Sequence, residues 1–381
     1  VDLSGAGFRL RAEAMHAEGR VTLPQLRLES GDARLTAHGE IKLDGERRFT
    51  AEGELQRFDP SRFAKVPAAQ INASFKAGGR LAPQAVVDAS FALKDSRVAG
   101  QPLSGQGSLA INWPHIPRAD IQLVSGANRL TARGAYGHPG DTLTIDLDAP
   151  QLAPYGLEGS LTGRVNFSGT AQKPVFVGQL NAGKVGRPGI VRLNELAIKA
   201  SGGGEPASPL LLDLSIASLD RPDQLALLRA IRIHGEGSNQ AHRLTASAEL
   251  AGKNRLSFAA DGGLSTDFAT WQGRLLEARA DNTDKSRNFR LAAPAPVKLA
   301  GAGWGFGPAR FTGDPLDWQA TLQAGADAKQ LHASLNATGS RMGLIDGELT
   351  AAMLDARGFK VSKHYTGELG DYVIERAFVE K

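Results

Sequence analysis

The sequence predicts an all-β protein whose fold is a long, curled β-sheet forming an elongated apolar groove (a β-taco), with a few short helices. Apolar and polar residues alternate with a period of two along most of the chain, and successive side chains of a strand point to opposite faces of a sheet. Glycine is abundant, at 45 of 381 residues, and aromatic residues are scarce, at 6%. A sheet this long must curl, stack or close, and small residues leave space inside a curl.

The alternation defines about two dozen amphipathic segments, each with one apolar and one polar face. Turn signals separate these segments, as at Asp44-Gly45 and Gly78-Gly79. Glycines inside the segments, such as Gly53 and Gly107, predict bulges or tight bends. The clearest segments lie at 8–14, 35–43, 49–55, 71–77, 109–113, 130–136, 143–147, 161–167, 210–216, 244–250, 256–260 and 331–337.

Two segments predict short helical breaks in the sheet, at 59–66 and 220–231. In the first, Asp59 is a suitable N-cap residue and Pro60 suits the first helical position. In the second, Leu225, Leu228 and Ile231 are spaced three apart, which places them on one face of a helix.

The remaining pattern predicts one continuous groove over residues 1–356. Residues 357–381 mix charges densely, and we expect either a final hairpin or a frayed end there, with no assigned role. The chain begins at Val1 within a predicted strand, and no apolar stretch reaches the roughly 18 residues that span a bilayer. We therefore expect a piece of a longer protein whose membrane anchor lies outside this chain.

The apolar sides of the predicted strands should face the groove, because that face must be hidden from water. A groove of this kind solvates acyl chains while polar head groups stay in water at its mouth. The predicted groove lining consists of Leu35, Ile41, Leu43, Phe75, Leu109, Ile111, Leu130, Leu143, Ile145, Leu147, Val165, Phe167, Leu212, Leu214, Ile216, Leu244, Phe258 and Leu335.

Composition and motifs argue against several other classes. The 44 basic and 40 acidic residues give a formal charge of +4, which is no basic field for nucleic acid. The chain has no cysteine, so disulfide scaffolds and thiol nucleophiles are excluded. The segment 105–110 matches a dinucleotide-binding pattern, but a strand continues where a helix should begin. Asp141, Asp146 and Asp148 resemble a calcium cluster, yet the alternation places Asp146 and Asp148 on the solvated face. We expect no enzyme activity, no cofactor and no metal.

Several phrases in order resemble the TamB family, the inner-membrane-anchored subunit of the translocation and assembly module of diderm bacteria. The resemblance covers roughly residues 30–350, and the tail after Arg357 has no counterpart in it. The phrases lie at 58–63, 67–72, 95–97, 100–105, 147–152, 157–161, 168–174, 241–244 and 271–275.

The resemblance implies a β-groove related to AsmA-like and bridge-like lipid-transfer proteins. It implies a periplasmic protein, anchored in the inner membrane in its full-length form, that carries phospholipid between the inner and outer membranes. It also implies a role in outer-membrane protein assembly and secretion, with a TamA-like outer-membrane barrel subunit as partner.

Two alternatives stay open at this point. Within the same family, the chain could be a scaffold whose strand edges pair with strands of β-barrel or autotransporter clients. In another class, it could be a secreted β-solenoid adhesin. The irregular spacing of the segments and their arginine-rich polar faces argue against the adhesin.

Overall fold

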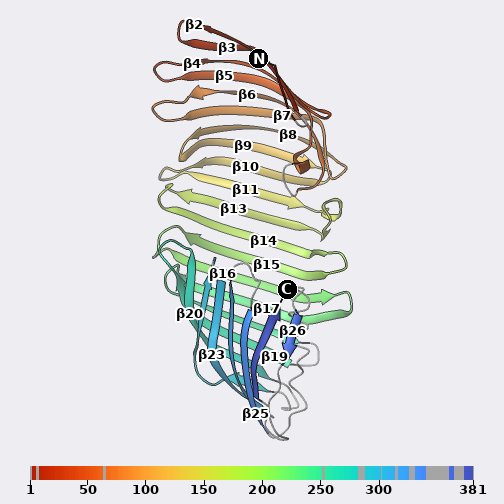
Figure 1. Cartoon of the computed structure of the whole chain (residues 1–381), viewed down its shortest axis with the longest axis vertical. Coiled ribbons are helices and arrows are strands. Elements are labelled where there is room, and N and C mark those ends of the chain that lie inside the picture. Colours follow the sequence, from red (N-terminus) through yellow and green to blue (C-terminus); the bar gives the residue numbers. More distant parts are fainter. Residues whose placement is uncertain are drawn as a thin grey trace. The chain divides into compact units, whose positions relative to one another are not determined.

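Antiparallel strands make up most of the described residues in the computed structural model (Figure 1). The structure describes residues 2–5, 8–62, 66–250, 254–281, 288–301, 303–313, 316–325, 331–339, 360–363 and 373–380, with the backbone alone from residue 316 onward. The described residues form two compact units, Val1–Ile198 and Lys199–Lys381. The predicted all-β class and the curled sheet are confirmed.

The first unit is a meander in which strands pair with their neighbours in chain order. The exceptions are β11 and β12, which pair with β13 and β14 respectively. The strands are β1 (Asp2–Gly5), β2 (Phe8–Ala17), β3 (Arg20–Ser30), β4 (Ala33–Lys42), β5 (Arg48–Phe58), β6 (Ala69–Arg80), β7 (Val86–Val98), β8 (Gln101–Asn112), β9 (His115–Ser125), β10 (Asn128–Tyr136), β11 (Thr142–Ala149), β12 (Glu158–Gly159), β13 (Leu161–Gly169) and β14 (Pro174–Arg187).

The second unit continues the same antiparallel pattern, and β15 (Val191–Gly203) crosses the boundary between the units. Within it, β20 pairs with β19, β21 and β22, and β25 pairs with β24 and β27. The strands are β16 (Pro209–Arg221), β17 (Gln224–Ser238), β18 (His242–Leu250), β19 (Asn254–Leu264), β20 (Thr270–Asp281), β21 (Phe289–Leu291), β22 (Ala295–Ala300), β23 (Gly303–Gly313), β24 (Leu316–Gly325), β25 (Leu331–Gly339), β26 (Lys360–Lys363) and β27 (Val373–Glu380).

The predicted break at 59–66 is a single 3₁₀ turn, η1 (Pro60–Arg62). The Asp59 carboxylate accepts the Ser61 N–H at 3.0 Å, as the predicted N-cap requires. Residues 63–65 lie outside the described part of the chain. A second 3₁₀ turn, η2 (Ala153–Tyr155), follows β11 and was not expected from the sequence.

The predicted helical break at 220–231 is wrong, because these residues lie in the β16–β17 hairpin. Ala226 and Ala230 in β17 adopt positive φ angles of 49° and 46°. The ladder between β17 and β18 shifts register between Arg229 and Arg232. A bulge inserts one extra residue into a strand, so the apolar spacing becomes three instead of two and imitates a helix.

The C-terminal segment contains a hairpin, one of the two outcomes expected for it. Lys360–Lys363 pairs antiparallel with Val373–Glu380, and the latter strand also pairs with β25. Most of the chain between 340 and 372 lies outside the described residues, so the predicted groove over 1–356 is described only up to 339.

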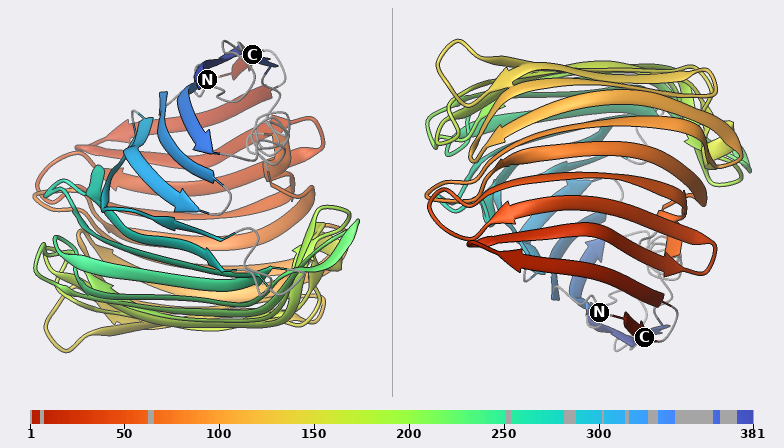
Figure 2. Two further views of the ribbon diagram at one scale, coloured as in Figure 1. Left: turned by 90° about the horizontal axis from the view of Figure 1, so that it is seen from below. Right: turned by 90° about the horizontal axis from the view of Figure 1, so that it is seen from above.

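The strands of the first unit are bent along their length (Figure 2), and a seam of bulges accompanies the bend. Register shifts occur in the β5–β6, β6–β7 and β7–β8 ladders. Arg57 and Asp95 adopt positive φ angles at this seam. The Asn72 side chain joins them, since its Oδ1 accepts the Arg57 N–H at 2.8 Å and its Nδ2 donates to the Asp95 carbonyl at 2.6 Å.

We expect Ser96→Ala to destabilise this seam. Ser96 is 2% exposed, and its hydroxyl accepts the Asn72 N–H and donates to the Asn72 carbonyl, both at 2.8 Å. Removing it leaves buried backbone groups unpaired, so the free energy of unfolding should fall by about 1–3 kcal/mol. Urea denaturation followed by circular dichroism measures this. Ser90→Ala, at an exposed position of the same strand, is the control and should leave the midpoint unchanged.

A closed hydrophobic core is largely missing from the described residues. The buried apolar side chains there are mostly alanines, and none of the large ones is completely buried. One compact cluster lies in the second unit, where Phe311 packs with Ala278, Ala295 and Ala309. Within each unit, the described strands belong to one hydrogen-bonded sheet.

Candidate functional site

Pairing in the first unit joins the apolar positions of successive strands into continuous rows. Directly opposed residues of an antiparallel ladder have their side chains on the same face, so each chain of partners marks one face of the sheet. One such row, the leucine row, takes one residue from every strand between β2 and β14 except β12. It consists of Leu10, Leu28, Leu35, Leu55, Ala73, Leu93, Gly105, Leu123, Leu130, Leu147, Gly163 and Leu180.

The predicted groove residues of the first unit, with one exception, share this apolar face. They lie on the leucine row or on parallel rows that are two, four or six residues away along each strand. Leu43 is the exception: it follows the end of β4, in the turn before β5, and is 48% exposed. Those on the face are Leu35, Ile41, Phe75, Leu109, Ile111, Leu130, Leu143, Ile145, Leu147, Val165 and Phe167.

The predicted residues of the second unit from Leu212 to Phe258 also share a face. Leu212 continues through Gly235 to Leu244, and Leu214 continues through Ile233 and Ala246 to Phe258. Ile216 lies opposite Ile231. Leu335 lies in β25, where the backbone alone is described, opposite Ala320.

This apolar face is only half-covered. Of the predicted lining residues with described side chains, only Ile216 is buried, whereas Phe258 is 40% exposed. The other strand residues among them have intermediate exposure. No helix or second sheet of the same unit covers the face among the described elements. Most of the apolar side chains in these rows are therefore partly exposed to solvent.

Gly53 and Gly107 shape the surface of this face. Neither lies at a register shift or has a positive φ, so the predicted bulges are absent there. Instead, a Cβ on Gly53 would come within 2.7 Å of the Phe75 ring, and a Cβ on Gly107 within 2.6 Å of the Phe91 ring. These glycines let the phenyl rings of neighbouring strands lie across the sheet.

The opposite, polar face carries a ladder of ion pairs between strands. Arg133 pairs with Asp120 at 3.3 Å, Arg164 with Asp146 at 2.6 Å, and Arg274 with Asp261 at 2.7 Å. Positive and negative charges are thus balanced between neighbouring strands as well as over the whole chain. Each exposed pair of this kind contributes little to stability. Together, the charged side chains keep this face hydrated.

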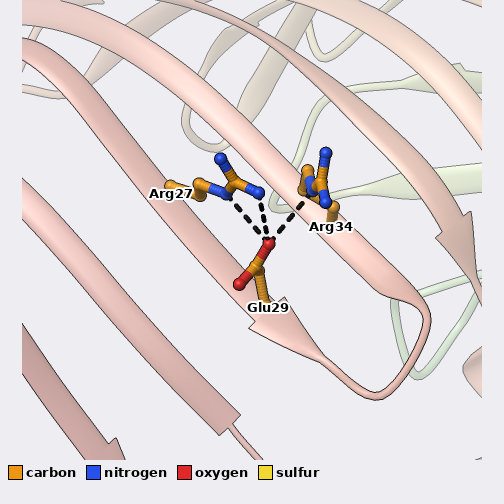
Figure 3. Close-up of polar contacts among 3 residues, drawn as sticks. All are labelled: Arg27, Glu29 and Arg34. Atoms are coloured by element: carbon orange, nitrogen blue, oxygen red, sulfur yellow. Dashed lines mark hydrogen bonds and ion pairs between the residues drawn. The ribbon is translucent and has the colours of Figure 1, made fainter.

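Figure 3 shows one such group near the start of the sheet. The Glu29 Oε1 atom accepts hydrogen bonds from Arg27 Nε at 2.9 Å, from Arg27 Nη2 at 2.7 Å and from Arg34 Nε at 3.2 Å. The hydrogen bond from Arg27 holds the pKa of the Glu29 carboxyl below its ordinary value, and Arg34 adds to this. The carboxylate therefore stays ionised on this face.

The structure also shows where the dinucleotide-like segment and the calcium-like aspartates lie. The segment 105–110 lies inside β8, so the strand continues where a dinucleotide site needs a helix. Asp146 is paired with Arg164, which uses the carboxylate that a calcium site would need. Among the described residues, no group of three or more acidic, histidine or cysteine side chains is placed to hold a metal ion.

Sequence reasoning missed two shallow hollows, of about 770 and 780 Å³. Residues of the polar face line most of the first, including Glu52, Glu54 and Lys76, whereas Arg243 and Asp261 border the second. Each hollow is lined by residues from several paired strands. The periodicity of a single strand carries no information about that pairing. One row of the apolar face also contributes to the first hollow, through Ala37, Gly53, Phe75 and Phe91.

His234 offers a pH-dependent probe of the polar face. Its Nδ1 lies 2.6 Å from Asp213 Oδ1, and this hydrogen bond raises the His234 pKa. Asp213→Asn should lower that pKa, as NMR titration of the ring protons can measure. In the wild type, the stability from this pair is full below about pH 6.5, the unfolded value, and is lost as the pH rises through the raised pKa. An unchanged pKa in the variant would contradict the assignment.

These features define a β-sheet protein with one ionic face and one open apolar face. The family model described as "TamB, N-terminal domain" matches residues 6–302, so the chain belongs to the TamB family. Members act in the translocation and assembly module of the cell envelope, with an outer-membrane partner. No curated protein and no solved structure matches the chain. Among the described residues, no helix is long and apolar enough to cross a membrane.

Proposed function

We propose that this chain is a conduit for phospholipid, with the acyl chains lying against the apolar face and the head groups in water. The supporting observation is the continuous set of apolar rows that no second layer of the same unit covers. Such a surface is unfavourable in water, because each methylene transferred from water contributes about 0.8 kcal/mol. A lipid chain covers the surface and is itself covered.

Continuity of the rows supports movement rather than static binding. The leucine row runs from β2 to β14 without a charged residue, and at about 4.8 Å per strand it extends roughly 50 Å. A chain sliding along it exchanges one apolar contact for an equivalent one. No catalytic step is needed, and we propose a non-enzymatic role without cofactor.

Family membership supports the location and partners of this conduit. We propose that it works in the periplasm between the inner and outer membranes, anchored through a segment outside this chain. A TamA-like outer-membrane barrel would be its partner, and lipid delivery would serve outer-membrane protein assembly.

Lipid extraction and mass spectrometry of the purified 381-residue chain test the proposal. We expect phospholipid to co-purify with the folded protein, because the apolar face retains acyl chains through purification. A matched sample of Ile145→Arg should carry less lipid. Monodisperse, folded protein that carries no phospholipid would contradict the conduit.

A further inference from the structure

One row on the apolar face of the second unit lacks large side chains over most of its length. This row, the glycine row, lies two residues along each strand from the row of Leu212 and Leu244. It consists of Leu210, Gly237, His242, Gly262, Gly273 and Val297. Glycine leaves polar backbone groups bare, so the apolar surface would be interrupted here unless another side chain covered the row.

The indole ring of Trp271 lies against the glycine row. A Cβ on either Gly262 or Gly273 would collide with this ring, so glycine at both positions makes room for it. Trp271 belongs to the next row of the same face, where it lies opposite Leu264 and Leu299. Its ring is partly exposed, and it therefore supplies the apolar surface that the two glycines lack.

His242 holds the ring in this position. The Trp271 Nε1–H donates to His242 Nε2 at 2.7 Å, and His242 Nδ1 lies 2.9 Å from the Ser238 carbonyl oxygen. A carbonyl oxygen can only accept, so Nδ1 carries the proton and Nε2 keeps the lone pair that the indole needs. His242 is 8% exposed, and its turn is tied to β19, since the Leu264 N–H donates to the Asn239 carbonyl at 2.7 Å.

The surroundings of His242 on this face are uncharged. The glycine row and the two rows beside it, as described in β16 to β20, contain no charged residue apart from this histidine. Glu205 and Asp267 lie in adjoining turns, and Asp267 accepts hydrogen bonds within its own turn. The charged residues of the adjoining strands lie on the polar face: Glu236, Arg243, Asp261 and Arg274.

We propose that Trp271 is an acyl-chain contact of the second unit and that His242 is its positioning residue. The inference rests on the proposed conduit and names residues that the predicted lining did not include. Because His242 satisfies the indole N–H, an acyl chain can cover the ring without leaving a donor unpaired. Leu299 and Trp304, directly opposite each other in the neighbouring strands and 49% and 38% exposed, extend this surface.

Fluorescence quenching by brominated lipid tests the contact, because bromine on an acyl chain quenches an indole that it touches. Trp271 is made the sole tryptophan by changing the other three to phenylalanine. The chain is mixed with vesicles of phosphatidylethanolamine and phosphatidylglycerol that carry brominated acyl chains, and the same vesicles without bromine give the reference. We expect the bromine to quench Trp271.

Two probes in a tryptophan-free chain read the conduit separately. Phe176→Trp lies on the apolar face of the first unit, opposite Phe167, and Val177→Trp lies on its polar face, opposite Asn166. The native residues are 36% and 54% exposed, so both positions accept a larger ring. The conduit predicts quenching at position 176 and none at position 177.

Substitutions of His242 test its positioning role, with circular dichroism to check the fold. His242→Leu removes the acceptor, so the indole N–H turns to water and quenching of Trp271 should be lost. His242→Gln offers an amide oxygen that does not titrate, so quenching should be kept. Lowering the pH from about 8 to about 5 protonates histidine and removes the Nε2 lone pair. Quenching should then be lost with His242 and kept with His242→Gln.

Each outcome separates this inference from the conduit. Quenching of Trp271 that His242→Leu abolishes supports the inference, even if position 176 stays unquenched and the conduit fails in the first unit. Quenching at position 176 without quenching of Trp271 overturns the inference and leaves the conduit standing. Quenching of Trp271 that is the same in His242→Leu and at both pH values overturns the role of His242. An absence of quenching at both positions overturns both proposals.

Discussion

Replacing Ile145 with arginine is expected to stop phospholipid passage along the first unit while leaving the sheet folded. Ile145 lies in the middle of β11, between Ala132 and Val165 on the apolar face. Its half-exposed position lets an arginine side chain bend outward without unfolding the strand. An acyl chain would nevertheless meet a charge in its path, and a penalty of about 3 kcal/mol slows passage about a hundredfold.

The measurement is outer-membrane phospholipid content in cells that produce the variant, in its full-length protein, at the wild-type level. The matched control is Thr162→Arg, which adds the same charge to the polar face of the neighbouring strand, opposite Asp148. That variant should behave as the wild type. An unchanged outer-membrane phospholipid content with Ile145→Arg at the wild-type protein level would contradict the conduit proposal.

Phe311→Ala is expected to destabilise the second unit strongly. Phe311 is 4% exposed, and its ring meets that of Phe289 edge-on at 6.0 Å within the cluster of Ala278 and Ala295. Truncating a buried phenylalanine leaves a cavity, so the free energy of unfolding of this unit should fall by about 3–5 kcal/mol. Urea denaturation gives the change.

Phe258→Ala is the informative comparison. Phe258 is 40% exposed on the apolar face of the same unit, so its truncation should cost about 1 kcal/mol or less. It should lower co-purified lipid instead. If Phe258→Ala destabilised the unit as strongly as Phe311→Ala, this face would be covered in solution and would not be open to lipid.

The two faces of the sheet could be predicted from single strands. Ile145, Leu147 and Val165 share a face because residues two apart along a strand point the same way, and the structure places all three in the apolar rows. Leu43 could not be placed this way, since its strand ends at Lys42 and periodicity does not show where pairing stops.

The helix expected at 220–231 was wrong because the bulges in this strand gave the apolar residues a helix-like spacing. Ala226 and Ala230 carry no sequence signal for a bulge, yet both adopt positive φ in β17. A bulge depends on the strand alongside, and its extra residue turns a period of two into an apparent period near three.

The sequence by itself determined the class of fold and which residues are apolar or polar on each strand, because alternation is a property of residues two positions apart. The tertiary structure alone decided what those residues do together. Pairing aligned Leu10 through Leu180 into one row, gathered Asn72 with Ser96 into the bulge seam, and brought Trp271 to His242 across the glycine row. These arrangements arise between strands, where register and bulges are set by neighbours distant in the chain.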